Sequence, residues 1–244
     1  MLVIVPVIGR IGVCMKDNQI ITLLLLEDGQ VKPYVFADKE KIRFGRKTPD
    51  NEPDLPSTSL AVGREHGVFL RINDSWFYCD MGNINGSFIH GKKVKPGING
   101  RMVPVLLNDG DSIKVLRDDD HFIPESMIVF MTGKREEQKW KFCKVLWKQM
   151  SFGNTKKDNI RIPLEGEKPG VLILEKAKEG WTVTAHDKTI TLNGKMLSPS
   201  QSTEIQPYDV LFVKGHYFII MQDGLIYPET KDVEVNVKRF KMFG

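Results

Sequence analysis

Apolar residues occur along the chain in short runs that are separated by turn-forming residues. Many of these runs alternate apolar and polar positions, a period of two that places successive side chains on opposite faces of a strand. Turn pairs such as Asn-Gly, Asp-Gly and Asn-Asp lie between them. No long stretch has apolar residues at helical spacing with suitable caps. The pattern therefore predicts an all-β protein, with many short strands arranged as sandwiches or barrels. The expected strands span residues 20–26, 34–36, 67–72, 76–79, 112–116, 126–131, 170–174, 181–184, 210–213 and 217–221.

Three short motifs of the first half return in the same order in the second half. Phe-Gly-Arg at residues 44–46 has a counterpart in Phe-Gly-Asn at 152–154, and His-Gly-Lys at 90–92 has one in Asn-Gly-Lys at 193–195. Asp-Ser-Ile-Lys-Val at 111–115 is echoed by Asp-Val-Leu-Phe-Val at 209–213. A weak internal repeat of this kind indicates two copies of one β-domain. We therefore expect a first domain in residues 1–133, a linker in 134–138, a second domain in 139–230 and a C-terminal tail in 231–244.

Charge and hydropathy narrow the classes of function. The 244 residues include 35 Lys plus Arg and 31 Asp plus Glu, a net charge of +4, which lacks the concentrated basic character of a dedicated nucleic-acid-binding protein. The longest apolar stretches, residues 2–8 and 20–26, hold about seven residues each. A membrane-spanning helix needs roughly 20. We expect neither nucleic-acid binding nor direct membrane insertion.

The N-terminal apolar stretch lacks the features of a signal peptide. It has no basic leader, Pro6 interrupts it, and Arg10 follows it without a small-residue cleavage site. Cys14, Cys79 and Cys143 are odd in number and widely spaced, which gives neither a disulfide framework nor a metal-ligand spacing. We therefore expect a cytoplasmic protein without a metal or a cofactor.

Three motifs of the first half follow one another in an order that is similar to a known family pattern. They are Phe-Gly-Arg at residues 44–46, Gly-Arg-Glu-His at 63–66 and Asn-Ile-Asn-Gly-Ser at 83–87, and the strand entry Asp-Gly-Asp-Ser-Ile at 109–113 follows them. This set resembles the forkhead-associated (FHA) domain, whose pattern reads Gly-Arg, then Ser-Arg-x-His, then Ser/Thr-x-Asn-Gly-Thr/Ser. The resemblance covers roughly residues 20–132 and implies a β-sandwich that recognises phosphothreonine peptides through loops at one end.

The chemistry of phosphate supports this resemblance. A phosphate group carries between one and two negative charges at neutral pH and needs several convergent donors. Arg46, which follows Gly45, can offer a planar fork of N–H donors, and Arg64 with the backbone N–H groups of its loop can add more. Asn85, which precedes the turn residue Gly86, can bind the backbone of an extended peptide.

Two positions of the predicted phosphopeptide site depart from the family pattern. Gly63 stands where the family has serine, and Asn83 stands where it has serine or threonine. The missing serine hydroxyl would have donated a hydrogen bond to the charged phosphate, which is worth about 1.5–3 kcal/mol, or about 10–100-fold in affinity. The resemblance gives His66 a structural role in tying the loops together, beside Gly45 and Gly86 as structural positions of the motif.

The second half resembles a degenerate copy of the same domain. Asn154 replaces the arginine, no Ser-Arg-x-His occurs between Asn154 and Trp181, and His-Asp-Lys-Thr at 186–189 does not reproduce the Asn-Gly-Ser turn. Without its arginine a phosphate site loses its strongest contact, so we expect this domain to serve in packing or docking. Such a tandem resembles the N-terminal cytoplasmic region of the EssC-type (FtsK/SpoIIIE-like) ATPases of bacterial type VII secretion.

The sequence as a whole predicts binding rather than catalysis. It contains no P-loop, no Gly-x-Ser-x-Gly and no placeable pair of carboxylates. The expected function is recognition of a phosphothreonine-containing partner by the first domain, and the resemblance implies a secretion-system protein as a possible partner. The alternative is a phosphorylation-independent scaffold in which neither domain binds phosphate. Phosphatase treatment of the partner distinguishes the two, because only the first kind of binding is then lost.

Overall fold

The computed structural model describes residues 20–97, 101–117, 123–133, 139–144, 148–177 and 180–236. The predicted linker at 134–138 and Cys14 lie outside these ranges. Within them the chain forms strands and no helix, which confirms the all-β fold class. It follows that the described residues contain no helix long and apolar enough to cross a membrane.

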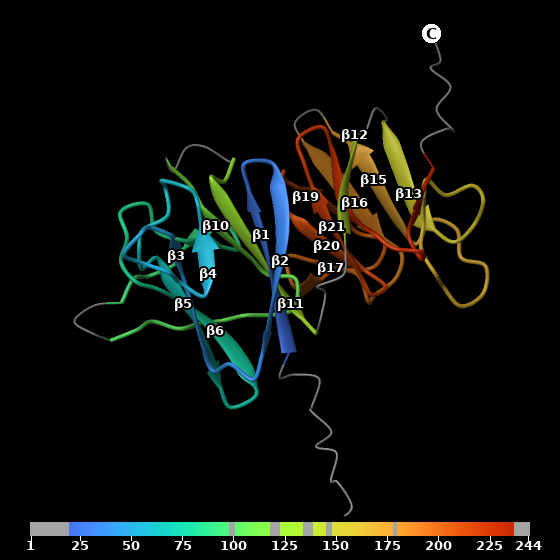
Figure 1. Cartoon of the computed structure of the whole chain (residues 1–244). Helices are drawn as coiled ribbons and strands as arrows, with labels where there is room; N and C mark the ends of the chain where they lie inside the picture. The colour runs from blue at the N-terminus through green and yellow to red at the C-terminus, as the bar shows by residue number, and fades with distance from the viewer. Residues whose placement is uncertain are drawn as a thin grey trace, which may run out of the picture.

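The first half of the described chain forms a sandwich of two sheets (Figure 1). One sheet has the order β2-β1-β11-β10-β7-β8 and the other β4-β3-β5-β6-β9. Their facing sides enclose a core in which Phe44, Phe69, Tyr78 and Phe130 are almost completely buried. The strands are β1 Ile20–Glu27, β2 Gln30–Ala37, β3 Lys41–Arg46, β4 Leu55–Ser57, β5 Gly67–Ile72, β6 Ser75–Asp80, β7 Phe88–Ile89, β8 Lys92–Lys93, β9 Val105–Leu106, β10 Ser112–Val115 and β11 Ser126–Thr132.

The second half forms another sandwich of two sheets. Their orders are β12-β22-β21-β20-β17-β18 and β19-β16-β15-β13-β14-β23. Phe152 and Phe218 meet edge to face in its core, with ring centroids 5.0 Å apart. The strands are β12 Lys139–Lys144, β13 Gln149–Gly153, β14 Ile160–Arg161, β15 Leu172–Lys176, β16 Trp181–Ala185, β17 Thr191–Leu192, β18 Lys195–Met196, β19 Ser202–Ile205, β20 Val210–Val213, β21 His216–Ile220, β22 Gly224–Glu229 and β23 Glu234–Val235.

Two expected segments differ in detail from these strands. The strand expected at residues 170–174 begins at Leu172, because Gly170 has a positive φ of 57° and donates its N–H to Asp158 instead of to a neighbouring strand. In the segment that we assigned to a C-terminal tail, Glu234 and Val235 pair with β14 and extend the second sandwich.

The two sandwiches have the same strand arrangement but a different chain order. Strands β3 to β11 correspond one by one to β13 to β21, including the parallel pairs β3–β4 and β13–β14. The place of β1, beside β11, is taken in the second sandwich by β22, which follows β21 in the chain. The place of β2 is taken by β12. The second sandwich is therefore a circularly permuted copy of the first.

The sandwiches pack against each other through a shared apolar layer. The outer face of the β1–β11 sheet meets the outer face of the β21–β22 sheet, so four sheets stack with three cores between them. Paired positions of the two sheets, Leu24 with Val129 and Ile226 with Ile219, meet in this layer. The contact thus joins two equivalent faces, as in a two-fold symmetric dimer. Its buried members are Leu24, Leu26, Met127, Val129, Met131, Val210, Tyr217, Ile219 and Ile226.

Polar contacts also link the sandwiches. The Tyr217 hydroxyl donates to Asp109 Oδ1 at 2.5 Å, and Lys114 Nζ lies 3.6 Å from Asp209 Oδ1. Burial lowers the pKa of Lys114, and the nearby Asp209 offsets part of this change. These contacts fix the relative placement of the two sandwiches.

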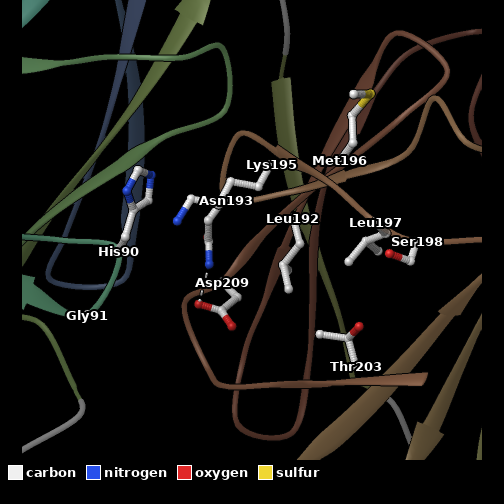
Figure 2. Close-up of a pocket in the computed structure, with 10 residues that line it drawn as sticks. All are labelled: His90, Gly91, Leu192, Asn193, Lys195, Met196, Leu197, Ser198, Thr203 and Asp209. Carbon is white, nitrogen blue, oxygen red and sulfur yellow. Dashed lines mark hydrogen bonds between the residues drawn. The ribbon is translucent and has the colours of Figure 1, made fainter. Parts of the chain in front are cut away.

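A groove of about 480 Å³ lies beside this contact, between the turns of two equivalent hairpins. Figure 2 shows His90 of the first sandwich facing Asn193 and Asp209 of the second. Three of the polar side chains that line it, His90, Asn193 and Asp209, already have partners in the protein. His90 Nε2 lies 2.6 Å from Asp111 Oδ1, and Asn193 donates to Asp209 at 2.9 Å. Because these three groups are satisfied in this way, we place the candidate site elsewhere.

Candidate phosphopeptide site

The predicted site residues converge at one end of the first sandwich. Three loops meet there, at residues 47–54 after β3, 58–66 between β4 and β5, and 81–87 between β6 and β7. Backbone and side-chain hydrogen bonds join the three loops directly. The structure thus brings together all five residues that sequence analysis assigned to phosphopeptide binding: Arg46, Gly63, Arg64, Asn83 and Asn85.

Arg46 ends strand β3 against the second of these loops. Its backbone N–H donates to Gly63 O at 2.8 Å. A Cβ atom on Gly45 would lie 2.0 Å from Arg64 O, so only glycine permits this close approach of β3 to the loop. The Arg46 Nε atom is buried and has no hydrogen-bond partner in the described part of the chain. A buried guanidinium nitrogen without an acceptor is suited to receive one from a ligand.

The loop that carries Arg64 has its carbonyl oxygens turned toward the protein. Gly63 O accepts from the Arg46 N–H, and Arg64 O accepts from Asn51 Nδ2 at 2.8 Å. Asn83 Nδ2 donates at 2.9 Å to both Glu65 O and His66 O. Among the described residues, the backbone N–H groups of Arg64 and Glu65 have no acceptor. The loop therefore keeps its four carbonyl acceptors occupied and two neighbouring N–H donors free, which is the arrangement of an anion-binding loop.

His66 is fully buried beneath this loop. Its ring Nδ1 accepts the backbone N–H of Gly63 at 3.0 Å, and its backbone N–H donates to Phe44 O at 3.0 Å. Its ring also packs edge to face on the Phe44 ring. Burial lowers the pKa of His66, and the charge of Asp80 offsets part of that effect. A neutral ring that accepts at Nδ1 carries its proton on Nε2. These contacts tie His66 to Gly63 and to strand β3, and its structural role in the motif stays a prediction.

Asn85 and Gly86 shape the third loop. Asn85 Nδ2 donates to Ala61 O at 2.8 Å, which ties this loop to the one that carries Arg64. Gly86 has a φ of +67°, a left-handed conformation that favours glycine. Asn85 as a whole is half-buried.

A chain of buried hydrogen bonds supports this loop from below. Tyr78 Oη and Ser87 Oγ are 2.7 Å apart, and Ser87 Oγ donates to Asp80 Oδ2 at 2.6 Å. Asp80 Oδ1 in turn accepts the Gly82 N–H at 2.8 Å. Burial raises the pKa of Tyr78, which keeps its hydroxyl protonated. Because these partners are satisfied inside the protein, they hold the loop instead of facing a ligand.

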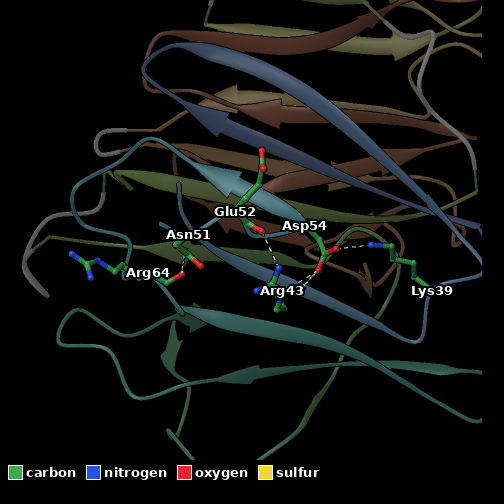
Figure 3. Close-up of polar contacts among 6 residues, drawn as sticks. All are labelled: Lys39, Arg43, Asn51, Glu52, Asp54 and Arg64. Carbon is green, nitrogen blue, oxygen red and sulfur yellow. Dashed lines mark hydrogen bonds and ion pairs between the residues drawn. The ribbon is translucent and has the colours of Figure 1, made fainter. Parts of the chain in front are cut away.

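Two acidic residues near the site, Glu52 and Asp54, are paired with neighbouring basic residues. Figure 3 shows Asp54 bonded to Lys39 and Arg43, while the Arg64 guanidinium points away from this cluster. Glu52 forms an exposed pair with Lys47 at 2.7 Å. Exposed pairs of this kind contribute little to stability, but they neutralise the Glu52 and Asp54 carboxylates of the first loop. The charge of Arg64 thus stays available at the surface.

Asn51 is a site residue that sequence analysis missed. Its Nδ2 donates to Arg46 O at 2.9 Å as well as to Arg64 O, so a single amide holds the backbones of both arginines. The only sequence signal is its place in the turn-forming stretch Pro-Asp-Asn at 49–51, which predicts a turn and not a link between two loops.

The equivalent end of the second sandwich is built differently. Asn154, at the position of Arg46, donates to Leu164 O at 3.1 Å and to Gly166 O, and accepts the Lys168 N–H. Asp158 lies buried beside it; burial favours a higher pKa for this carboxyl, but hydrogen bonds from Thr155 and other groups hold it below its ordinary value. A satisfied amide and an ionised carboxylate are a poor setting for phosphate.

Comparisons with known proteins identify the first of these sandwiches. Residues 42–115 match the family model of the FHA domain, so an FHA domain lies in the first half of the chain. FHA domains are modules of phosphopeptide-dependent protein–protein interaction and are not enzymes. No curated protein matches the chain.

Several solved structures are similar to part of the chain. Full-length yeast Pml1p is 15% identical over 46% of this chain and 81% of its own, with a TM-score of 0.39. The FHA domain of CT664 from Chlamydia trachomatis is 14% identical over 47% of this chain and 99% of its own, with a TM-score of 0.37. Mycobacterium tuberculosis EmbR, solved with a low-affinity phosphopeptide, is 21% identical over 47% and 24%, with a TM-score of 0.35.

Proposed function

We propose that the first sandwich binds a phosphothreonine-containing partner protein in the cytoplasm. Arg46 and Arg64 bind the phosphate together with the backbone donors of the loop at 63–66, and Asn85 binds the backbone of the peptide. Gly63 and Asn83 belong to the same site and shape its loop. The free, buried thiols of Cys79 and Cys143 agree with a reducing compartment.

One observation carries this proposal. The four carbonyl oxygens of residues 63–66 all accept hydrogen bonds from the protein, while the N–H groups of Arg64 and Glu65 and the Arg46 Nε have no acceptor in the described ranges. Donors without acceptors, next to two arginines, are suited to an anion with several oxygens. A scaffold surface without a phosphate ligand gives no reason for this arrangement.

The second sandwich serves in this proposal as a fixed docking module that does not bind phosphate. Support comes from the satisfied Asn154 amide and the buried Asp158 carboxylate at the equivalent end. The proposal extends to a place in a type VII secretion assembly, with another secretion protein as partner. The arrangement of one near-complete and one altered sandwich in tandem supports this extension, because it resembles the EssC-type ATPases.

The test is fluorescence anisotropy with a degenerate phosphothreonine peptide pool and the unphosphorylated pool as reference. The full chain is used, because an isolated first sandwich would expose the apolar layer that contains Met127 and Val129. Arg46→Ala is compared with Arg71→Ala, which removes the same charge near the far end of β5. We expect Arg46→Ala to weaken binding about 10–100-fold, since it removes a hydrogen bond to a charged group.

The control and the alternative have distinct outcomes. Arg71→Ala is expected to bind within about twofold of the wild type, because exposed charges away from the contact change affinity little. Equal binding of the phosphorylated and unphosphorylated pools supports the phosphorylation-independent scaffold. Absence of binding at millimolar peptide, or equal loss in both arginine variants, refutes the phosphate site.

A further inference from the structure

The two departures from the FHA pattern face each other in space. A Cβ atom on Gly63 would lie 1.7 Å from Asn83 Oδ1 and 2.6 Å from Asn83 Cγ. No pair of non-bonded atoms tolerates such distances, so any side chain at position 63 has to displace the Asn83 amide. Twenty residues apart in sequence, the glycine and the asparagine thus occupy one shared volume.

The Asn83 amide is held firmly in this volume. Its Nδ2 donates at 2.9 Å to Glu65 O and at 2.9 Å to His66 O. Because both partners are carbonyl oxygens, they accept only from the nitrogen, and this fixes which end of the amide faces Gly63. Asn83 therefore cannot move aside for a larger residue at position 63 without losing both hydrogen bonds.

These bonds act on the part of the loop that the ligand meets. In a planar trans peptide, the N–H of each residue points opposite to the carbonyl of the residue before it. The bond from the Arg46 N–H to Gly63 O therefore directs the Arg64 N–H outward, and the bond from Asn51 to Arg64 O directs the Glu65 N–H outward. Asn83 holds the next two carbonyls, those of Glu65 and His66, and so anchors the loop directly after its free donors.

We propose that Gly63 and Asn83 are a matched pair and that Asn83 is a positioning residue of the anion site. In place of a hydroxyl at position 63, the pair supplies oriented backbone donors. Gly63 provides the space, and Asn83 uses it to fix the loop that carries Arg64. This inference rests on the proposed phosphate binding and adds which groups replace the missing serine.

The test measures the full chain with the single variants Gly63→Ser and Asn83→Ser and with the double variant that carries both changes. The probe is the phosphothreonine peptide pool, and the melting temperature of each variant is recorded. We expect each single change to weaken binding about tenfold, since Gly63→Ser displaces the Asn83 amide and Asn83→Ser releases the carbonyl of Glu65, while that of His66 keeps the Met81 N–H. The double variant is expected to bind within about threefold of the wild type, because the serine introduced at position 63 then has room and supplies a hydroxyl donor.

A matched control separates space from hydrogen bonding. Asn83→Asp keeps the shape of the side chain, so it leaves no room for a serine at position 63. Its carboxylate also has no N–H to donate. Combined with Gly63→Ser, it is expected to remain at least tenfold weaker than the wild type. The amide resonances of Arg64 and Glu65 are followed by NMR as free phosphothreonine is added. We expect both to shift in the wild type and to shift less than half as much in Asn83→Ser.

The outcomes separate this inference from the proposed function. The matched pair is overturned if the fold-loss of affinity of the double variant equals the product of the fold-losses of the two single variants. Wild-type affinity in either single variant overturns it as well. Changes confined to the melting temperature, with unchanged affinity and amide shifts, overturn the positioning role. If the wild type binds no phosphopeptide, the proposed function and the positioning role both fail. In that case the melting temperatures still test the pair, because a loss in the double variant that equals the sum of the two single losses would overturn it.

Discussion

Tyr217→Phe tests the contact between the two sandwiches with the loss of one oxygen atom. Tyr217 is almost completely buried on β21, and its hydroxyl donates to Asp109 Oδ1 across the contact at 2.5 Å. Asp109 also accepts the N–H of Thr132, so it keeps one partner after the change. Phenylalanine retains the packing of the ring in the apolar layer.

The expected cost follows from the charge and burial of the partners. A hydrogen bond to a charged group contributes about 1.5–3 kcal/mol. For a chain of this size, each kcal/mol shifts the melting temperature by roughly 2–4 °C. We therefore expect the free energy of unfolding to fall by about 1.5–3 kcal/mol and the melting temperature by about 3–12 °C.

Urea and thermal unfolding of the full chain measure this change. Tyr34→Phe is the matched control, because the Tyr34 hydroxyl on β2 has no hydrogen-bond partner among the described residues. We expect the control to change the free energy of unfolding by less than about 0.5 kcal/mol. Equal, small effects of Tyr217→Phe and Tyr34→Phe would show that the sandwiches do not dock in solution as described.

Three further changes test other parts of the structure. Burial holds the pKa of His66 below its unfolded value of 6.5, so the unfolded chain binds more protons than the folded chain below pH 6.5. The wild-type free energy of unfolding should therefore fall as the pH is lowered, by up to about 1.4 kcal/mol per pH unit more than that of His66→Gln. Urea titrations at pH 7.5 and 5.5 measure this difference. Asn154→Arg is expected to cost about 1–3 kcal/mol and to create no second phosphate site, since it removes three internal hydrogen bonds; urea unfolding and peptide stoichiometry measure this, and a stoichiometry of two contradicts it. Gly224→Ala places a Cβ 2.4 Å from the Phe142 ring, so we expect a loss of about 1–3 kcal/mol in thermal unfolding, and wild-type stability would argue against the pairing of β12 with β22.

Local sequence patterns predicted most of the long strands correctly. In β16 the buried Trp181 and Val183 alternate with the half-buried Thr182 and Thr184, and this period of two can be detected without knowledge of any neighbour. The continuous apolar run at residues 20–26 has a structural reason, because β1 is covered on one face by its own sandwich and on the other by the second. The same run was consistent with other buried elements, so the contact between the sandwiches could not be derived from it.

The permuted strand order could not be predicted in this way. Alternation shows that a segment is a strand but not which strand it pairs with, and the repeated motifs lie between β3 and β11 and their equivalents. Strands β12 and β22 lie outside the repeat, and their pairing joins residues about 80–90 positions apart. Such long-range pairing depends on packing of the whole domain.

Sequence motifs located the three loops of the candidate site but not the geometry between them. Gly-Arg, Arg-x-His and Asn-Gly mark the three loops, and the hydrogen bonds between those loops bring Arg46, Arg64 and Asn85 to the same end of the first sandwich. The sequence showed that Gly63 and Asn83 depart from the family pattern, but not that they share one volume. That relation depends on distances between loops, which spacing along the chain does not contain.

The permuted position of β22 has a consequence for synthesis on the ribosome. The first sandwich has all of its strands once residue 132 has emerged, so it can fold while the rest of the chain is being made. The second cannot pair β12, an edge strand whose only neighbour among the described strands is β22, until residues 224–229 follow. The same late strand supplies Ile226 to the apolar layer between the sandwiches. The hairpin of β21 and β22 therefore completes both the second domain and its docking. Until it has been made, the outer face of the first domain is exposed and has to stay free of other contacts.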